Sequence, residues 1–151
     1  MIPTQILEHA VTVKLKDYDD MELILLKGHL ILEQMLNQIL IAHGLDIKRI
    51  ESMRLMYGKT LELVAALNSQ HLKSEYQHLK KINQIRNSIA HKLFPENYDV
   101  DLKEWSCLVL GHTPKTINTK RTYKIHVIKA FSFLAGKLQS MADDIASAKP
   151  A

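Results

Sequence analysis

The stretch that decides the fold is Lys81-Ile82-Asn83-Gln84-Ile85-Arg86-Asn87-Ser88-Ile89-Ala90-His91. In and around it, apolar residues recur every three or four positions, which is the period of an amphipathic α-helix. This apolar stripe consists of Leu79, Ile82, Ile85, Ile89 and Leu93. At about 100° per residue, Asn87 and His91 share a face roughly opposite the stripe. We expect this helix, here called the motif helix, to span about 70–92 and to turn that face to a ligand or a second chain.

The same periodicity continues outward along nearly the whole chain, and no segment alternates clearly enough to predict a strand. We expect helices at about 4–15, 18–43, 46–68, 70–92, 101–110 and 119–147. Gly44 ends the second helix, and Asp46 offers an N-cap to the third. Asp101, followed three positions later by Glu104, has the pattern of a capping box for the fifth. The sequence therefore predicts one all-α domain over residues 1–151.

The helix expected over 18–43 has more apolar surface than one buried face requires. Its second half has an apolar and a polar face, but its first half places apolar residues on all sides: Leu23, Ile24, Leu25, Leu26 and Leu30. A helix that is apolar all round needs cover on more than one side. Two explanations stay open at this point: the helix is central to a bundle within one chain, or a second copy covers part of it.

Composition restricts the class of protein and its partners. The chain of 151 residues is long enough for one domain with a sizeable core, and its formal charge of +4 permits binding to a polyanion such as RNA. The single cysteine, Cys107, cannot form an internal disulfide, and Met1-Ile2-Pro3-Thr4 lacks the basic start of a signal peptide. Charged and amide side chains interrupt the longest apolar helix, which argues against a membrane span. We expect a cytoplasmic protein.

Arg86, Asn87 and His91 are residues of the kind that can cut RNA without a metal ion. A guanidinium stays charged and fits phosphate oxygens, whereas an imidazole takes up and releases protons near neutral pH. A structural interpretation is also open from these residues alone. Arg86 would then pair with an acid of a neighbouring helix, and His91 would cap the end of its own helix, where a cation is favourable.

The pattern resembles the HEPN superfamily, whose motif is an arginine, a polar residue directly after it, and a histidine four to six positions after the arginine, late in a helix. The segment Leu25–Leu36 is similar to the hydrophobic helix that usually precedes that motif. The resemblance extends over about residues 18–146. It implies an antiparallel helical bundle that dimerises through the motif helix and cleaves RNA without metal or cofactor.

The resemblance also implies roles for individual residues. His91 would act as general base on the ribose 2′-hydroxyl or as general acid on the leaving 5′-oxygen, while Arg86 stabilises charge on the phosphate. Asn87 would orient the imidazole or donate to a phosphate oxygen. One imidazole cannot conveniently serve both sides of an in-line displacement, so two chains would form a composite cleft. The products would end in 2′,3′-cyclic phosphates.

Two further sets of residues are candidates for binding. His29, Glu33 and Asn37 follow at intervals of four, but no further strong ligand accompanies them, so we expect no metal site. This stripe is either solvated or directed into the groove beside the motif helix, where Glu33 would lie near Arg86 and orient it. The second set is a basic run that either follows an RNA backbone or is simply solvated: Lys115, Lys120, Arg121 and Lys124.

The expected function is therefore that of a toxin or phage-defence ribonuclease, with a protein antitoxin or inhibitor as a possible partner. HEPN toxins paired with minimal nucleotidyltransferase antitoxins have a tyrosine two positions after the histidine, but Leu93 stands there in this chain. Regulation by modification of that tyrosine is thus not expected. Two alternatives are a non-catalytic helical regulator, similar to the mannitol operon repressor, and a subunit that binds a nucleotide or a nucleotidyltransferase in the same cleft.

Overall fold

The computed structural model describes residues 3–68, 72–91, 98–112 and 119–148. Within these ranges the chain forms seven α-helices and no strand, which confirms the all-α prediction. The helices are α1 (Thr4–Lys16), α2 (Met21–Ala42), α3 (Ile47–Met53), α4 (Tyr57–Leu67), α5 (Ser74–Ala90), α6 (Tyr98–Leu110) and α7 (Lys120–Ala148).

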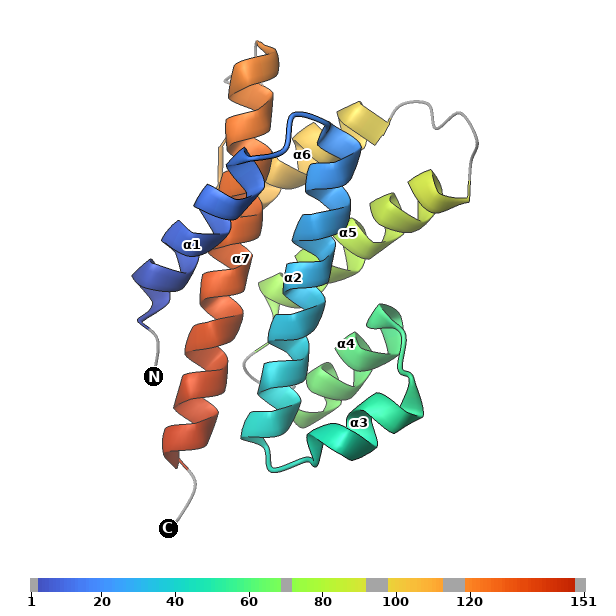
Figure 1. Ribbon diagram of the computed structural model, residues 1–151, viewed down its shortest axis with the longest axis vertical. Coiled ribbons are helices and arrows are strands. Elements are labelled where there is room, and N and C mark those ends of the chain that lie inside the picture. The colour runs from blue at the N-terminus through green and yellow to red at the C-terminus, as the bar shows by residue number, and fades with distance from the viewer. Residues whose placement is uncertain (1–2, 69–71, 92–97, 113–118, 149–151) are drawn as a thin grey trace.

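The longest helix, α7, packs against α1, α2 and α6, while α5 packs against α2, α4 and α6 (Figure 1). Helix α1 runs antiparallel to α7. Near the middle of both helices, Oγ1 of Thr12 lies 2.8 Å from Oγ of Ser132. At the start of α7, Nζ of Lys124 donates to the carbonyl oxygen of Lys16 at 3.3 Å. The second half of α1 is thus hydrogen-bonded to the first half of α7.

Helix α2, in contrast, runs in the same direction as α7 (Figure 1). Lys124 near the start of α7 pairs with Asp19 just before α2, at 3.7 Å, and Phe131 further along α7 lies against Gly28 of α2. The expectation of an antiparallel bundle is therefore wrong for this pair. Because α2 and α7 are far apart in sequence, no short turn forces them into opposite directions.

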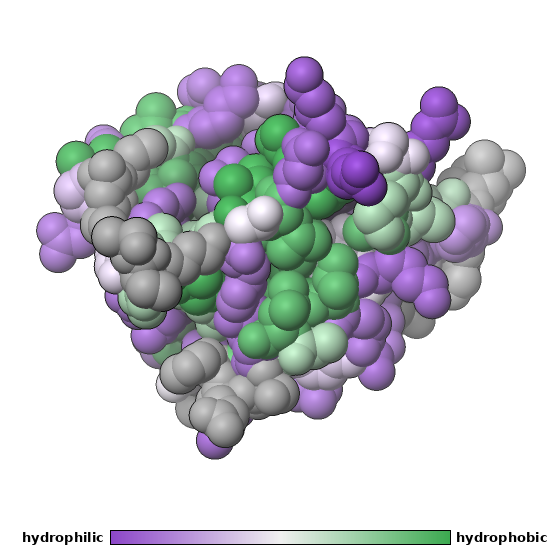
Figure 2. Space-filling model, turned by 90° about the horizontal axis from the view of Figure 1, so that it is seen from below, coloured by the Kyte–Doolittle hydropathy of each residue, from purple (hydrophilic) through white to green (hydrophobic). Residues whose placement is uncertain are grey.

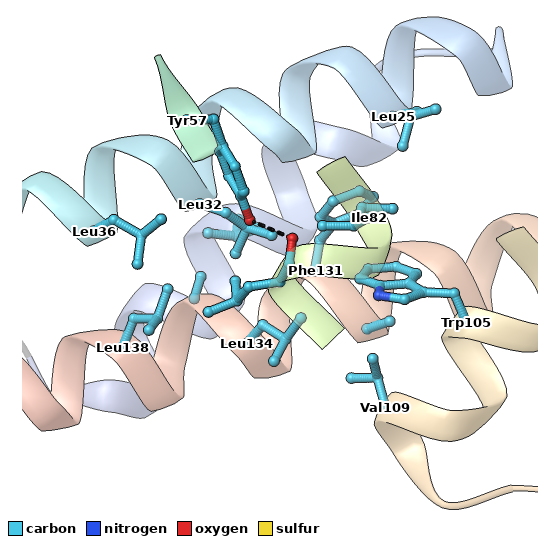
Figure 3. Packing of buried hydrophobic residues seen from close by; sticks show 14 of the residues in the cluster. Leu25, Leu32, Leu36, Tyr57, Ile82, Trp105, Val109, Phe131, Leu134 and Leu138 are labelled. Carbon is cyan, nitrogen blue, oxygen red and sulfur yellow. Dashed lines mark hydrogen bonds between the residues drawn. The ribbon is translucent and has the colours of Figure 1, made fainter. Parts of the chain in front are cut away.

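The core lies where α2, α5, α6 and α7 meet. A Cβ atom on Gly28 would lie 2.6 Å from the ring of Phe131, so the missing side chain lets this ring pack on the backbone of α2. The ring of Trp105 lies beside that of Phe131, with centroids 4.9 Å apart (Figure 3). Nε1 of Trp105 donates to the carbonyl oxygen of His78 at 2.9 Å. These contacts join α2, α7, α6 and α5 around one apolar centre.

The motif helix is α5, and it buries the stripe that the sequence predicted. Its buried residues are Leu79, Ile82, Ile85 and Ile89; Leu93 lies outside the described residues. The helix begins at Ser74 rather than near residue 70, and it ends at Ala90, with His91 as its C-cap.

The single helix expected over 46–68 is two helices. Asp46 does cap the first, because its side chain accepts from the backbone N–H of Lys48 at 3.0 Å. The helix nevertheless ends at Met53, because Arg54 takes the left-handed conformation (φ 49°, ψ 46°). The break directs the second helix so that its first residue, Tyr57, is buried and donates to the carbonyl oxygen of Leu79 in α5 (Figure 3). Packing on α5 thus overrides the local helical periodicity.

Other predicted helix ends were partly correct. Gly44 ends α2 as expected, with φ 93° and hydrogen bonds from Gly44 and Leu45 back to the last turn. The capping box of Asp101 and Glu104 is wrong, because α6 already begins at Tyr98 and both residues lie inside it. The earlier start is associated with a long-range contact, since the hydroxyl of Tyr123 donates to Asp99 at 2.7 Å.

The end of the molecule where α3 and α4 lie exposes apolar side chains. Figure 2 looks onto this end and shows a hydrophobic area bordered by hydrophilic residues. Ile47 and Met53 of α3 are 47% and 59% exposed, and Leu67 at the end of α4 is 43% exposed. Exposed apolar surface is therefore present on α3 and at the end of α4.

Candidate functional site

A groove with a cavity volume of about 990 Å³ lies between α2, the start of α4 and α5. This volume is at the upper end of the range found for small-ligand sites. Its lining residues are Leu23, Leu26, Lys27, His29, Leu30 and Glu33 from α2, Leu55, Met56, Tyr57, Gly58, Lys59 and Glu62 from the α4 side, and Asn83, Arg86 and Asn87 from α5. Of the four residues predicted to be catalytic, three therefore share one groove.

The inner wall of the groove joins the three helices through a buried histidine. Nε2 of His29 lies 2.9 Å from Oδ1 of Asn83, and the imidazole stacks on the ring of Tyr57 with centroids 4.1 Å apart. With the amide oxygen as acceptor, Nε2 carries the ring proton. His29 is only 6% exposed, and burial lowers its pKa; the Asn83 bond opposes this shift, and the nearby charge of Arg86 adds to it. Burial thus favours the neutral form of the ring.

Arg86 is a half-buried cation in the same groove. Its Nη1 donates to Oδ1 of the neighbouring Asn87 at a long 3.4 Å. Among the described residues, no carboxylate lies within 4.0 Å of its guanidinium. The ion pair that these residues do form joins Lys124 to Asp19, neither of which lines the groove. The interpretation in which Arg86 pairs with an acid of another helix therefore has no support in the described part of the chain. Its remaining N–H donors can meet an anion that enters the groove.

Glu33 lies on the α2 wall one turn after His29. Burial raises the pKa of its carboxyl group, and the positive charge of Arg86 lowers it in part. The two groups are close enough to influence each other, yet they form no direct ion pair within 4.0 Å. The structure therefore places Glu33 in the predicted groove, without the direct contact by which it would orient Arg86.

His91 stands at the end of a row of polar residues on α5. Asn83, Asn87 and His91 are spaced four apart, so they follow one face of the helix. The first two line the groove, whereas His91 is exposed beyond it. As C-cap residue, its backbone N–H donates to the carbonyl oxygen of Asn87 at 3.1 Å. Within one chain, His91 thus does not line the groove that holds Arg86.

Comparison of the chain with protein-family models, with curated proteins and with solved structures finds no match. What the groove can do is therefore argued from its own geometry.

The predicted basic run is only partly available for binding. Lys120 and Arg121 are exposed at the start of α7, but Lys124 is half-buried and held by Asp19 and a backbone carbonyl. Lys115 lies outside the described residues. Lys120 and Arg121 can therefore contact a phosphate backbone without breaking a side-chain hydrogen bond or ion pair within the described part of the chain.

The stripe of His29, Glu33 and Asn37 divides in the structure. Its first two members line the groove, whereas half-buried Asn37 does not. No group of three His, Cys, Asp or Glu side chains suited to a metal occurs among the described residues. In the same residues, no helix combines the length and apolar character needed to cross a membrane.

Several groove residues had no role predicted from the sequence. Among them are Asn83, which holds His29, and the two cations at the rim, Lys27 and Lys59. A signal for Asn83 was present, because it lies four positions before Asn87 and eight before His91. No comparable signal marked the lysines, since only the fold brings α2 and α4 to the same side of α5.

Proposed function

We propose that the protein is a metal-independent endoribonuclease of the HEPN type, with a composite active site formed by two copies of the chain. The residue pattern of the motif helix suggests the family, and the groove provides the physical support. The observation that carries the proposal is the row Asn83, Asn87 and His91 beside the guanidinium of Arg86, which has no carboxylate within 4.0 Å among the described residues.

In this proposal, Arg86 binds the phosphate whose P–O5′ bond is cut. A half-buried guanidinium is a stronger anion ligand than an exposed one, because the low local dielectric strengthens its interactions. Asn87, which accepts from Arg86 through its oxygen, keeps its amide N–H groups for a phosphate oxygen. The exposed Lys120 and Arg121 contact the RNA backbone further from the cut.

His91 carries the proton transfer. One imidazole takes the proton of the 2′-hydroxyl as the 2′-oxygen attacks phosphorus, and a second gives a proton to the leaving 5′-oxygen. The products are a 2′,3′-cyclic phosphate and a 5′-hydroxyl. Because His91 stands outside the groove of its own chain, a second copy is needed to bring two such imidazoles to one phosphate.

The surface beside the groove is suited to that second copy. Leu26 and Leu30 of α2 are 40% and 45% exposed at its edge, although α2 already packs against α1, α4, α5 and α7 of its own chain. Burying these leucines would stabilise a dimer through the hydrophobic effect. The central-helix explanation therefore accounts for the buried face of α2 but leaves this side uncovered.

The test is incubation of the purified protein with mixed RNA in the presence of a chelator. We expect cleavage that leaves 2′,3′-cyclic phosphate ends and is not reduced by the chelator. Products with a 3′-hydroxyl, or activity that returns only with added divalent metal, would contradict the mechanism. Intact RNA together with a specific bound protein would favour the alternative of a non-catalytic helical regulator.

The biological role proposed with this activity is that of a toxin or a phage-defence ribonuclease restrained by a protein antitoxin. Expression of the chain in a bacterial host is then expected to slow growth, and the Arg86→Ala variant at the same protein level is expected to relieve the effect. Equal growth inhibition by both proteins would contradict this role.

A further inference from the structure

The groove holds two opposite charges that do not neutralise each other by direct contact. Arg86 has no carboxylate within 4.0 Å, and no hydrogen bond to the carboxylate of Glu33 is found among the described residues. The other carboxylate lining the groove, that of Glu62, already accepts a hydrogen bond from the hydroxyl of Tyr76. Glu33 and Arg86 thus present an acceptor and a donor set side by side.

The amide of Asn83 adds a third group with a defined orientation. Its Oδ1 faces Nε2 of His29, so its Nδ2 carries two N–H donors that are not used in that bond. The stack of His29 on Tyr57 fixes this arrangement from the opposite side. The polar part of the groove therefore offers carboxylate acceptors from α2, and amide and guanidinium donors from α5.

Apart from the exposed Lys27 and Lys59, most of the remaining lining is apolar. Leu23, Leu55 and Met56 contribute side chains to the same cavity, and Met56 is 76% exposed. Apolar walls with a few convergent polar groups suit a flat heterocycle, whose faces are apolar and whose edge carries donors and acceptors. Unstacked bases of single-stranded RNA are recognised in this way, through their faces and their Watson–Crick edges.

We infer that the groove binds a guanine nucleotide of the RNA chain, with the carboxylate of Glu33 accepting from N1–H and from the exocyclic N2 amino group. Guanine alone among the four RNA bases presents two adjacent donors on this edge, and a carboxylate accepts both. The amide of Asn83 donates to O6, and Arg86 binds the phosphate of the same nucleotide. The inference rests on the proposed function, because it assigns the base next to the bond that is cut.

Burial of Glu33 makes such a contact selective. A carboxylate that is half removed from water loses hydrogen bonds to water molecules, and a ligand replaces them only if it donates to the carboxylate oxygens. Burial also raises its pKa, and the charge of Arg86 limits the rise. Adenine would place an acceptor nitrogen against the carboxylate, and hypoxanthine would supply N1–H but no amino group.

The experiment is calorimetric titration of the protein with GMP, IMP and AMP. Hydrogen bonds to a charged group contribute about tenfold to a hundredfold in affinity. We expect GMP to bind more tightly than AMP by about this factor, with IMP between them. Glu33→Gln should abolish the preference for GMP. The matched control is Glu62→Gln, which changes the other groove carboxylate and should keep the preference; thermal unfolding checks that both variants are folded.

Several outcomes would overturn the inference. These are equal affinity for GMP and AMP, IMP binding as tightly as GMP, no binding of any of the three, a preference that survives in Glu33→Gln, or one that is lost equally in Glu62→Gln. The proposed nuclease is judged separately with RNA. Guanine-selective binding without RNA cleavage would contradict the proposed nuclease activity but support the guanine site. RNA cleavage with no preference for guanine nucleotides would support the nuclease activity but contradict the guanine site.

Discussion

At the scale of single residues, the groove contains charged side chains that are half-buried and form no direct ion pair with each other. A half-buried guanidinium costs free energy unless it is paired, and structures pair such groups when stability alone is at stake. Within the described part of the chain, the hydrogen bond of the Arg86 side chain is a 3.4 Å contact with Asn87, although Glu33 lines the same cavity. Retaining a cation in this state is typical of a site whose partner is a ligand.

Arg86 and His91 can be changed without damaging the core, because neither belongs to the buried stripe of α5. We expect Arg86→Ala and His91→Ala each to lower the rate of RNA cleavage by about 10²–10⁴-fold, the usual effect of removing a proton-transfer or charge-stabilising group. The melting temperature should stay near that of the parent. Lys81→Ala, at an exposed position of the same helix, serves as control. If both active-site variants melt far below the parent, these residues are structural.

The raised pKa of Glu33 predicts a pH dependence of nucleotide recognition. Because burial favours the protonated form, the carboxylate takes up its proton at a higher pH than an ordinary glutamate. A protonated carboxyl group cannot accept from both donors of guanine. The preference for GMP over AMP should therefore be full at neutral pH and decline as the pH falls through this raised pKa. Titrations at a series of pH values measure it, and a preference that grows on acidification would contradict the assignment.

At the scale of helices, the sequence was most informative where local signals and burial agree. The motif helix and its buried stripe were predicted because four apolar residues keep the helical period, and Gly44 and Asp46 carry recognisable signals for a helix end and a helix start. The break at Arg54 carried no such signal. Neither glycine nor proline stands there, and the turn exists because Tyr57 must reach α5.

The contact between α2 and α7 depends on a missing side chain. A Cβ on Gly28 would lie 2.6 Å from the Phe131 ring, whereas one on Gly58 would meet only the amide nitrogen of Asn83 at an ordinary 3.7 Å. We expect Gly28→Ala to lower the free energy of unfolding by about 1–3 kcal/mol through overpacking. Gly58→Ala should be neutral or stabilising by up to about 1 kcal/mol, because alanine favours the helix. Chemical denaturation distinguishes them, and equal effects would contradict the packing argument.

The contact between α2 and α5 should make stability depend on pH. Since burial lowers the pKa of His29 from its ordinary 6.5, the folded state prefers the neutral ring. The stability that the buried, neutral His29 contributes is full above pH 6.5, and it is lost as the pH falls through the lower pKa of this residue in the folded protein. His29→Gln, which can keep a hydrogen bond to Asn83, should flatten the fall in unfolding free energy on acidification, while His9→Gln, at an exposed position of α1, should not. An unchanged pH profile in His29→Gln would contradict this.

The candidate site was predictable in part for the same physical reason. Arg86 and Asn87 belong to one helix, so their spacing alone placed them on neighbouring faces. The pairing of His29 with Asn83 joins residues 54 positions apart, and only the packing of α2 on α5 brings them together. Helical periodicity predicts which face of α2 and of α5 is apolar, but it does not predict which residues of the two helices contact each other.

At the scale of the whole molecule, the exposed leucines beside the groove make the oligomeric state testable. We expect a homodimer at micromolar concentration by sedimentation velocity, with the motif helix and the first half of α2 at the interface. Leu26→Glu combined with Leu30→Glu should give a folded monomer and abolish RNA cleavage, because both side chains are already exposed in a single chain. Leu108→Glu, a similarly exposed leucine on α6, is the control. A monomeric parent would count against the composite site.

The pairing of the first helix with the last has a consequence for synthesis on the ribosome. Thr12 of α1 meets Ser132 of α7, 120 residues later, and α1 packs mainly on α7. While translation proceeds, α1 therefore lacks the surface that covers Val11 and Leu15, two residues that are buried in the finished protein. The nascent chain must carry these apolar side chains in a form accessible to chaperones until most of α7 has emerged, and the domain closes only then.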